Sequence, residues 1–337
     1  MTEIVLGMGT SHGPQLLIPP EQWELRVNAD KQNPDHWFRG KKYNFAELVE
    51  LRRGEGFGNS VTPKFMQDSY ATCQRALAKL VQVYQQTKPD VAVIIGNDQF
   101  ELFGESLQPA FAVYWGDTIA NIPKPPELVA QLPPGIAPAE IGYCPPQRAE
   151  YSCAPRLGKH LIDSLIAQGF DVAQSKALPT GPQGHNGVPH AYGFIYRKIM
   201  GDAVIPHVPV LVNTHYPPNR PNARRCFEFG RAVARAIRSW PGAERIALFG
   251  SGGFTHYVID EQFDRMVLDA MVHKKPETIC TIDETLFESG GTAEIKNWIP
   301  VFGAMLELGL DMTLVDYVPC YRSEAGTGNA MAFAYWN

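Results

Sequence analysis

The sequence lacks several features that mark common classes of protein. Its six cysteines are scattered with no C-x-x-C pair, so neither a zinc knuckle nor a disulfide framework is indicated. No apolar run approaches the roughly 18 residues of a transmembrane helix. Charge of one sign is not in large excess, because 30 basic and 35 acidic residues give a net charge of -5. This balance favours neither nucleic acid nor an anionic membrane as a partner, and a small-molecule substrate is the default expectation.

The first residues and the composition indicate a globular protein of the cytoplasm. Met-Thr-Glu-Ile provides no basic region ahead of an apolar stretch, and we therefore expect no secretory signal and a cytoplasmic location. The 337 residues, 45% of them hydrophobic, are enough for one large α/β domain or two ordinary ones. Because no internal repeat or low-complexity tract divides the chain, we predict a single domain over residues 1–337.

Short apolar runs alternate with amphipathic stretches along most of the chain. Uninterrupted apolar runs are typical of parallel strands that are covered on both faces. The pattern predicts an α/β fold with a central, mostly parallel sheet flanked by helices. The predicted strands are residues 3–9, 91–96, 110–115, 170–175, 208–213 and 245–250, and the predicted helices are residues 68–86, 156–168, 224–240 and 260–272.

Two long segments do not follow this alternation. Residues 19–64 mix prolines, tryptophans and charged residues, and residues 117–150 contain eight prolines. Both are rich in aromatic and apolar residues, which is typical of packed loops and not of disordered linkers. We therefore expect two covering excursions from the domain.

Polar residues gather where the predicted strands end. In open α/β sheets, ligands bind outside the carboxyl ends of the strands, because there the loops diverge and backbone groups become free. Five of the nine histidines follow predicted strands in this way, and a glutamine follows another. We expect these residues to face one pocket. They are His12, Gln99, His185, His190, His215 and His256.

Carboxylates that could join these imidazoles follow the glycine pair in "GSGGFTHYVIDEQFD". Asp260, Glu261 and Asp264 lie at a predicted helix start, where a carboxylate also caps the helix and stabilises its dipole. A carboxylate with two imidazoles and open coordination positions suits non-haem Fe(II). The ligands would come from distant strands, so spacing alone does not establish the site.

Five stretches in this order resemble the class III extradiol ring-cleavage dioxygenases. That family includes the β-subunit of protocatechuate 4,5-dioxygenase and enzymes acting on gallate, methylgallate and biphenyl catechols. Each motif is loose alone, and the ordered set is much more specific. The stretches are "GTSHGPQL" (9–16), "KPDVAVIIGNDQFELF" (88–103), "PHAYGFIYRKIMG" (189–201), "VNTHYPPNRPNARRCFEFGRAVARAI" (212–237) and "GSGGFTH" with "DEQFD" (250–264).

The resemblance implies an activity and roles for individual residues. It implies that a mononuclear Fe(II), held by two histidines and a glutamate, opens a catechol-type aromatic acid with O2 beside its two hydroxyl groups. His12 matches the first iron ligand of the family. His190, eleven residues before Gly201, matches the acid/base histidine, and His256 matches a histidine that contacts substrate. We predict His190 and His256 as the catalytic residues.

Two positions depart from the family pattern. Gln99 stands where the family has its second histidine ligand, and a strict register over "DEQFD" places Gln262 at the carboxylate position, one residue after Glu261. A neutral amide oxygen is a weak ligand for iron. We predict a metal set of His12, Gln99 and Glu261. Other candidates to complete this set remain open, namely Asp98, Glu101, His215 and Gln262.

The remaining site residues and the alternatives follow from the same pattern. We predict that His185, His215 and Arg220 bind the substrate, with Arg197 and Arg224 as other candidates for its carboxylate. Gln99 and Gln262 favour an alternative, a metal-free or non-redox enzyme, either a hydrolase or a carbon-carbon lyase, that uses histidine acid/base catalysis. A non-catalytic oxygenase subunit is a third possibility. The resemblance also implies a homo-oligomer, for which the C-terminal residues 315–336 could provide a surface or could instead roof the pocket.

Overall fold

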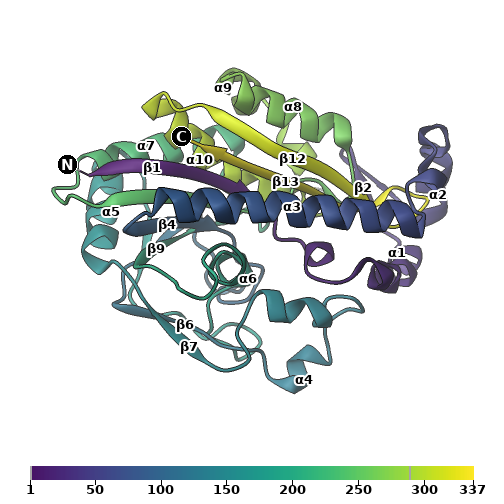
Figure 1. Ribbon diagram of the computed structural model, residues 1–337, viewed down its shortest axis with the longest axis horizontal. Coiled ribbons are helices and arrows are strands. Elements are labelled where there is room, and N and C mark those ends of the chain that lie inside the picture. Colours follow the sequence, from purple (N-terminus) through teal and green to yellow (C-terminus); the bar gives the residue numbers. More distant parts are fainter. Residues whose placement is uncertain (1, 288–289) are drawn as a thin grey trace.

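A computed structural model describes residues 2–287 and 290–337, and its core is one large mixed sheet (Figure 1). The strands of this sheet are β1 (Glu3–Thr10), β4 (Val91–Gly96), β5 (Phe111–Tyr114), β8 (Ala173–Ser175), β9 (His207–Val212), β10 (Arg245–Ser251), β11 (His256–Val258), β12 (Met312–Tyr321) and β13 (Thr327–Trp336). Two small antiparallel sheets of two strands each lie outside it, one of β2 (His36–Phe38) and β3 (Lys41–Tyr43), the other of β6 (Thr118–Asn121) and β7 (Ala149–Ser152).

Four parallel strands form the centre of the sheet. The order is β11-β13-β1-β10-β4-β9-β5-β8, with β12 also paired to β13. Strands β1, β10, β4 and β9 run parallel to one another, whereas β5 and β13 add antiparallel to the two sides. All six predicted strands are present, and the predicted fold class is confirmed. The carboxyl ends of the four central strands therefore meet at one edge of the sheet.

Helices cover both faces of the sheet. The helices are α1 (Val27–Gln32), α2 (Phe45–Leu51), α3 (Pro63–Thr87), α4 (Pro126–Val129), α5 (Pro155–Ala167), α6 (His190–Phe194), α7 (Ala223–Arg238), α8 (Glu261–Val272), α9 (Pro276–Cys280) and α10 (Trp298–Leu308). The long α3 crosses one face, and α7 and α10 lie on the other (Figure 1). The four predicted helices correspond to α3, α5, α7 and α8. None of the helices in the described residues is long and apolar enough to span a membrane.

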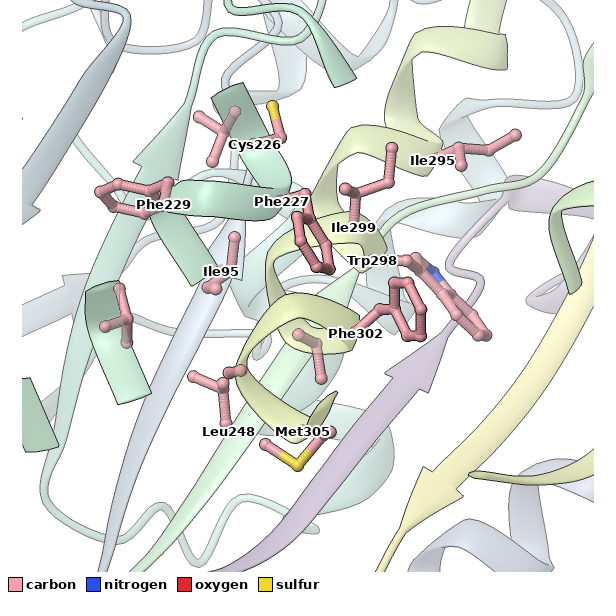
Figure 2. Packing of buried hydrophobic residues seen from close by; sticks show 14 of the residues in the cluster. Ile95, Cys226, Phe227, Phe229, Leu248, Ile295, Trp298, Ile299, Phe302 and Met305 are labelled. Atoms are coloured by element: carbon pink, nitrogen blue, oxygen red, sulfur yellow. The ribbon is translucent and has the colours of Figure 1, made fainter. Parts of the chain in front are cut away.

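Alternation along the central strands divides the core into two layers. In β4, Val93 and Ile95 face the layer of α7 and α10, whereas Ala92 and Ile94 face the layer of α3 and α6. Helix α10 contributes large buried side chains to its layer, among them Trp298 and Phe302 (Figure 2). Removing one such aromatic ring typically costs about 3–5 kcal/mol of folding free energy. This packing holds α10 against the central strands, and so keeps the segment before α10 at the carboxyl edge of the sheet.

The glycines of β1 permit this close packing. A Cβ atom on Gly7 would lie 2.5 Å from the sulfur of Met305, and one on Gly9 would lie 2.5 Å from the ring of Trp298. A larger residue at Gly7 would displace the Met305 side chain, and one at Gly9 would displace the Trp298 ring.

Both predicted excursions are folded segments. Residues 19–64 include α1, α2 and the β2–β3 hairpin, and α2 begins with a capping box between Asn44 and Glu47. Strand β1 points away from the two termini and toward the side where α1 and α2 lie (Figure 1). The first excursion therefore lies at the carboxyl edge of the sheet.

The C-terminal segment forms the antiparallel pair β12–β13, in which β13 also pairs with β1. Arg322 and Asn329 of this segment line the cleft described below, and a role in a dimer stays a prediction. One sheet thus takes strands from both ends of the chain. A single domain over residues 1–337 stays a prediction, and residues 1, 288 and 289 lie outside the described residues.

A buried histidine at the amino-terminal end of β9 makes stability depend on pH. His207 donates from Nδ1 to the Ile205 carbonyl at 3.0 Å, accepts from the Tyr196 hydroxyl at 2.6 Å, and has a pKa lowered to about 4 by burial. The unfolded chain, with a histidine pKa of about 6.5, binds a proton at pH 5 that the folded chain does not. Stability therefore falls as the pH drops from about 6.5 to 4, and His207 accounts for a loss of about 2 kcal/mol at pH 5 relative to pH 8.

Urea unfolding of the wild type and of His207→Gln at both pH values measures this contribution. We expect the difference in stability between pH 8 and pH 5 to be smaller in the variant by that amount. Equal pH dependence in the two proteins would contradict the assignment.

Candidate active site

Two histidines and a glutamate meet at the carboxyl edge of the sheet. His12 follows β1, His190 begins α6, and Glu294 lies in the short 3-10 helix Gly290–Asn297 that precedes α10. One ligand atom from each residue lies within 4.8 Å of the others, which is the spacing of a possible metal site. This is a His-His-Glu set with nitrogen and oxygen donors.

The imidazole of His12 is oriented toward this cluster. Its Nδ1 lies 2.9 Å from the Ser251 hydroxyl at the end of β10, and its Nε2 lies 3.2 Å from Oε2 of Glu294. Within the described residues, that Nε2 is buried and lacks a well-aligned hydrogen-bond partner. Burial lowers the pKa of His12, even though the charge of Glu294 acts in the opposite direction. A neutral imidazole with a buried, unused nitrogen is the form in which histidine binds a metal.

Glu294 is held as a buried carboxylate. It is 2% exposed and accepts a hydrogen bond from the Gly253 amide at 2.7 Å and from Nε2 of Gln99 at 2.5 Å. Burial alone would raise its pKa, but the neighbouring imidazoles of His12 and His256 outweigh that effect and hold the pKa well below its usual range. Gln99 thus orients Glu294 by donating its amide hydrogen.

His190 is oriented by a second carboxylate. Its Nδ1 lies 2.6 Å from Oε2 of Glu101, and its backbone amide donates to the same carboxylate. Burial would lower the pKa of His190, but the charge of Glu101 raises it overall. Burial likewise opposes ionisation of Glu101, yet His190 and Lys124 bring the pKa of Glu101 down to about 2. A carboxylate on Nδ1 leaves Nε2 for a metal, as in many carboxylate–histidine–metal arrangements.

Asp98 shapes the loop after β4. Its carboxylate accepts hydrogen bonds from the backbone amides of Glu101, Leu102 and Phe103 at 2.8–3.0 Å. Burial raises its pKa to about 6, and the charge of Glu101 adds to this effect. These bonds use the carboxylate for loop structure, and they present Glu101 to His190.

His256 lies beside the cluster, and hydrogen bonds to a buried aspartate hold its loop in place. Its Nδ1 donates to the Phe254 carbonyl at 2.8 Å, while Nε2 lies 3.9 Å from Oε1 of Glu294. The buried carboxylate of Asp264 accepts from the backbone amide and hydroxyl of Thr255 at 3.0 and 2.6 Å. Asp264 therefore positions the loop that carries His256.

His215 also lies close to the cluster. It is half-buried, and burial lowers its pKa to about 4, with Glu294, His256, His190 and Arg220 as electrostatic neighbours. The Thr214 hydroxyl lies 2.7 Å from its Nδ1. His215 is thus a neutral neighbour of the His-His-Glu set, on the side of β9.

Three predicted site residues lie outside the His-His-Glu cluster. Glu261 accepts from the Tyr321 hydroxyl at 2.8 Å and pairs with Arg265 at 3.1 Å, so its carboxylate is used at the start of α8. Nε2 of His185 forms a hydrogen bond with the Ile122 carbonyl at 2.9 Å. Arg220 lines a separate pocket beside β5 and β8. Neither His185 nor Arg220 lines the cleft at the cluster.

Glu294 was missed by sequence reasoning, and one signal could have found it. It is the only acidic residue in the otherwise mainly apolar stretch 290–306, "GGTAEIKNWIPVFGAML". A lone carboxylate in a segment that must be buried requires partners, and functional sites are a common reason for such a residue.

The cluster opens into a cleft of about 210 Å³. The residues of the cluster and its neighbours line this cleft together with aromatic and cationic side chains. Among the lining residues are His12, Gln99, Glu101, His190, His256, Glu294, Arg26, Lys124, Tyr143, Tyr257 and Arg322. The size and the mixture of aromatic, cationic and imidazole groups suit a small polar aromatic ligand.

Comparison with known proteins identifies the class to which this fold and site belong. Residues 66–323 match the family described as the catalytic LigB subunit of aromatic ring-opening dioxygenase, and the chain belongs to this family. The resemblance to class III extradiol dioxygenases is thereby confirmed.

Individual relatives carry related names. The chain is 34% identical over 167 residues to gallate dioxygenase of Pseudomonas putida, an alignment covering 44% of this chain and 45% of the relative. It is 25% identical over 201 residues to a 2,3-dihydroxyphenylpropionate/2,3-dihydroxicinnamic acid 1,2-dioxygenase of Photorhabdus laumondii, covering 60% of this chain and 52% of the relative. The chain spans about half the length of the curated relatives it matches.

Proposed function

We propose that this protein catalyses extradiol ring cleavage of a catechol-type aromatic compound by O2 at a mononuclear Fe(II) site. The observation that carries the proposal is the convergence of His12, His190 and Glu294 at the strand ends of a chain of the LigB family. Two imidazoles and one carboxylate with an open side form the donor set of non-haem Fe(II) oxygenases. Aromatic compound catabolism is the corresponding cellular role. A homo-oligomer and a cytoplasmic location stay predictions.

The residues present fit a metal ion. The buried Nε2 of His12 without a well-aligned partner, the imidazole of His190 backed by Glu101 and the ionised Glu294 would hold it. Bound there, Fe(II) would supply the redox chemistry that couples a catechol to O2. Metal binding would displace any proton on Nε2 of His190, while Nδ1 would keep its hydrogen bond to Glu101.

Two residue roles differ from those that the sequence predicted. His190, expected to transfer protons, is assigned to the metal because its Nδ1 is used by Glu101. Gln99, expected as a ligand, is assigned to the orientation of Glu294 because its amide donates to that carboxylate. Proton transfer at the hydroxyl groups of the substrate then belongs to His256, whose Nε2 lies 3.9 Å from Glu294.

Metal analysis coupled to oxygen uptake tests the proposal. Protein purified without oxygen and supplied with Fe(II) is expected to hold about one iron per chain and to consume O2 only when a catechol is added. A protein that binds no iron and consumes no O2 with any catechol would contradict the proposal. That result would favour the metal-free acid/base enzyme that Gln99 suggests.

A further inference from the structure

Three cationic side chains line the cleft, and two of them are already neutralised. Nζ of Lys124 lies 2.7 Å from the Glu140 carboxylate. The guanidinium of Arg322 donates two hydrogen bonds to Asp30, at 2.7 and 2.9 Å. Each of these two cations is therefore paired with a carboxylate of the protein itself. The charge that remains is that of Arg26.

Arg26 lines the cleft, and no carboxylate partner of this kind is found for it in the described residues. Its hydrogen bond is a long one, 3.4 Å, to the Pro134 carbonyl, and within the described residues no carboxylate lies at salt-bridge distance from it. The stem of the side chain lies along Gly135, where an added Cβ would be 3.1 Å from Cγ of Arg26. The two covering excursions, residues 19–64 and 117–150, therefore meet at this side chain and hold it in place.

The surroundings of Arg26 favour an anion. Burial lowers its pKa, the positive charge of Arg322 lowers it further, and Asp30 offsets only part of this effect. A partly desolvated guanidinium beside another cation gains more from a bound carboxylate than an exposed one does. Arg26 would also bind a planar carboxylate through two parallel hydrogen bonds.

Tyr257 is an electrostatic neighbour both of Arg26 and of Glu294 in the His-His-Glu set. The pKa of Tyr257 is raised by burial and by Glu294, while Arg26 and Arg322 act in the opposite direction, so the phenol has both groups as electrostatic neighbours. Its backbone is held at φ 68°, a value that residues other than glycine rarely adopt. Such strain recurs at binding sites. An aromatic ring bound at the cluster would thus extend past Tyr257 toward Arg26.

We infer that Arg26 binds the carboxylate of the substrate and thereby makes the enzyme selective for catechols that carry an acidic group. This inference rests on the proposed function and specifies its substrate class. Arg26 takes the role that the sequence analysis gave to Arg220, which lines another pocket.

Binding to the iron-loaded enzyme without O2 tests the inference separately from turnover. The probes are 3,4-dihydroxybenzoate and the uncharged 4-methylcatechol, measured by calorimetry. In Arg26→Gln we expect the dissociation constant of the acid to rise about 10- to 100-fold, the range for loss of a charge-assisted pair, and that of 4-methylcatechol to change less than about 2-fold. Arg26→Lys should retain part of the preference.

Arg53→Gln is the matched control. Arg53 lies in the same excursion with its side chain 74% exposed, outside the cleft, so its loss removes the same charge and should change neither constant. Equal effects of Arg26→Gln on both probes, or none on either, would overturn the inference. If the wild type consumes O2 with 4-methylcatechol but binds the acid no better, the proposed function stands and the inference fails. If it binds neither and consumes no O2 with either, both fail.

Discussion

Replacing Glu294 with glutamine is expected to abolish metal binding and, with it, catechol-dependent O2 uptake. The variant keeps the shape of the side chain and can still accept from the Gly253 amide, but it removes the only negative charge of the His-His-Glu set. We expect metal affinity to fall by more than about 100-fold, because loss of an outer-shell partner alone typically costs about 10- to 100-fold. Equilibrium dialysis against Fe(II) without oxygen measures the change.

Glu261→Gln is the matched control for this prediction. Glu261 is the carboxylate that the register of "DEQFD" favours, but it is bonded to Tyr321 and Arg265. We expect the metal affinity of this variant to equal that of the wild type. If Glu261→Gln lost the metal and Glu294→Gln kept it, the ligand set derived from the geometry would be wrong.

The second large effect is expected at Glu101. Glu101→Gln removes the charge that orients the imidazole of His190 from a distance of 2.6 Å and raises its pKa. We expect metal affinity to fall by about 10- to 100-fold, the range typical of a residue that holds a ligating histidine. The cooperative unfolding transition in urea should remain, because the backbone bonds of the loop go to Asp98 and not to Glu101.

Glu140→Gln serves as the comparison for Glu101. Glu140 lines the same cleft, and its carboxylate pairs with Lys124 at 2.7 Å, whereas that of Glu101 pairs with His190. Its substitution should change metal affinity only slightly. Similar losses in the two variants would indicate a general effect of charge in the cleft and would argue against a specific role of Glu101 on His190.

The sheet and half of the site could be predicted from the sequence for a clear physical reason. Buried parallel strands require uninterrupted apolar runs, and parallel strands place their carboxyl ends at one edge, so polar residues after those runs must lie near one another. This argument found His12, His190, His215 and His256, which the structure brings around Glu294.

The rest could not be predicted because it depends on tertiary contacts. Glu294 lies in a short 3-10 segment without periodicity, and only the packing of α10 on the sheet brings it to His12. The direction of the Gln99 amide follows from its partner Glu294, which the family pattern does not reveal. Strands β12 and β13 were missed because their apolar residues are interspersed with small and polar ones, so the segment resembled a loop.

The most direct test of this account is anomalous diffraction at the iron edge from crystals grown with Fe(II) in the absence of oxygen. We predict a single strong peak within bonding distance of Nε2 of His12, Nε2 of His190 and the carboxylate of Glu294. A peak bound instead by Gln99 or beside Glu261, or no peak at the carboxyl edge of the sheet, would contradict it.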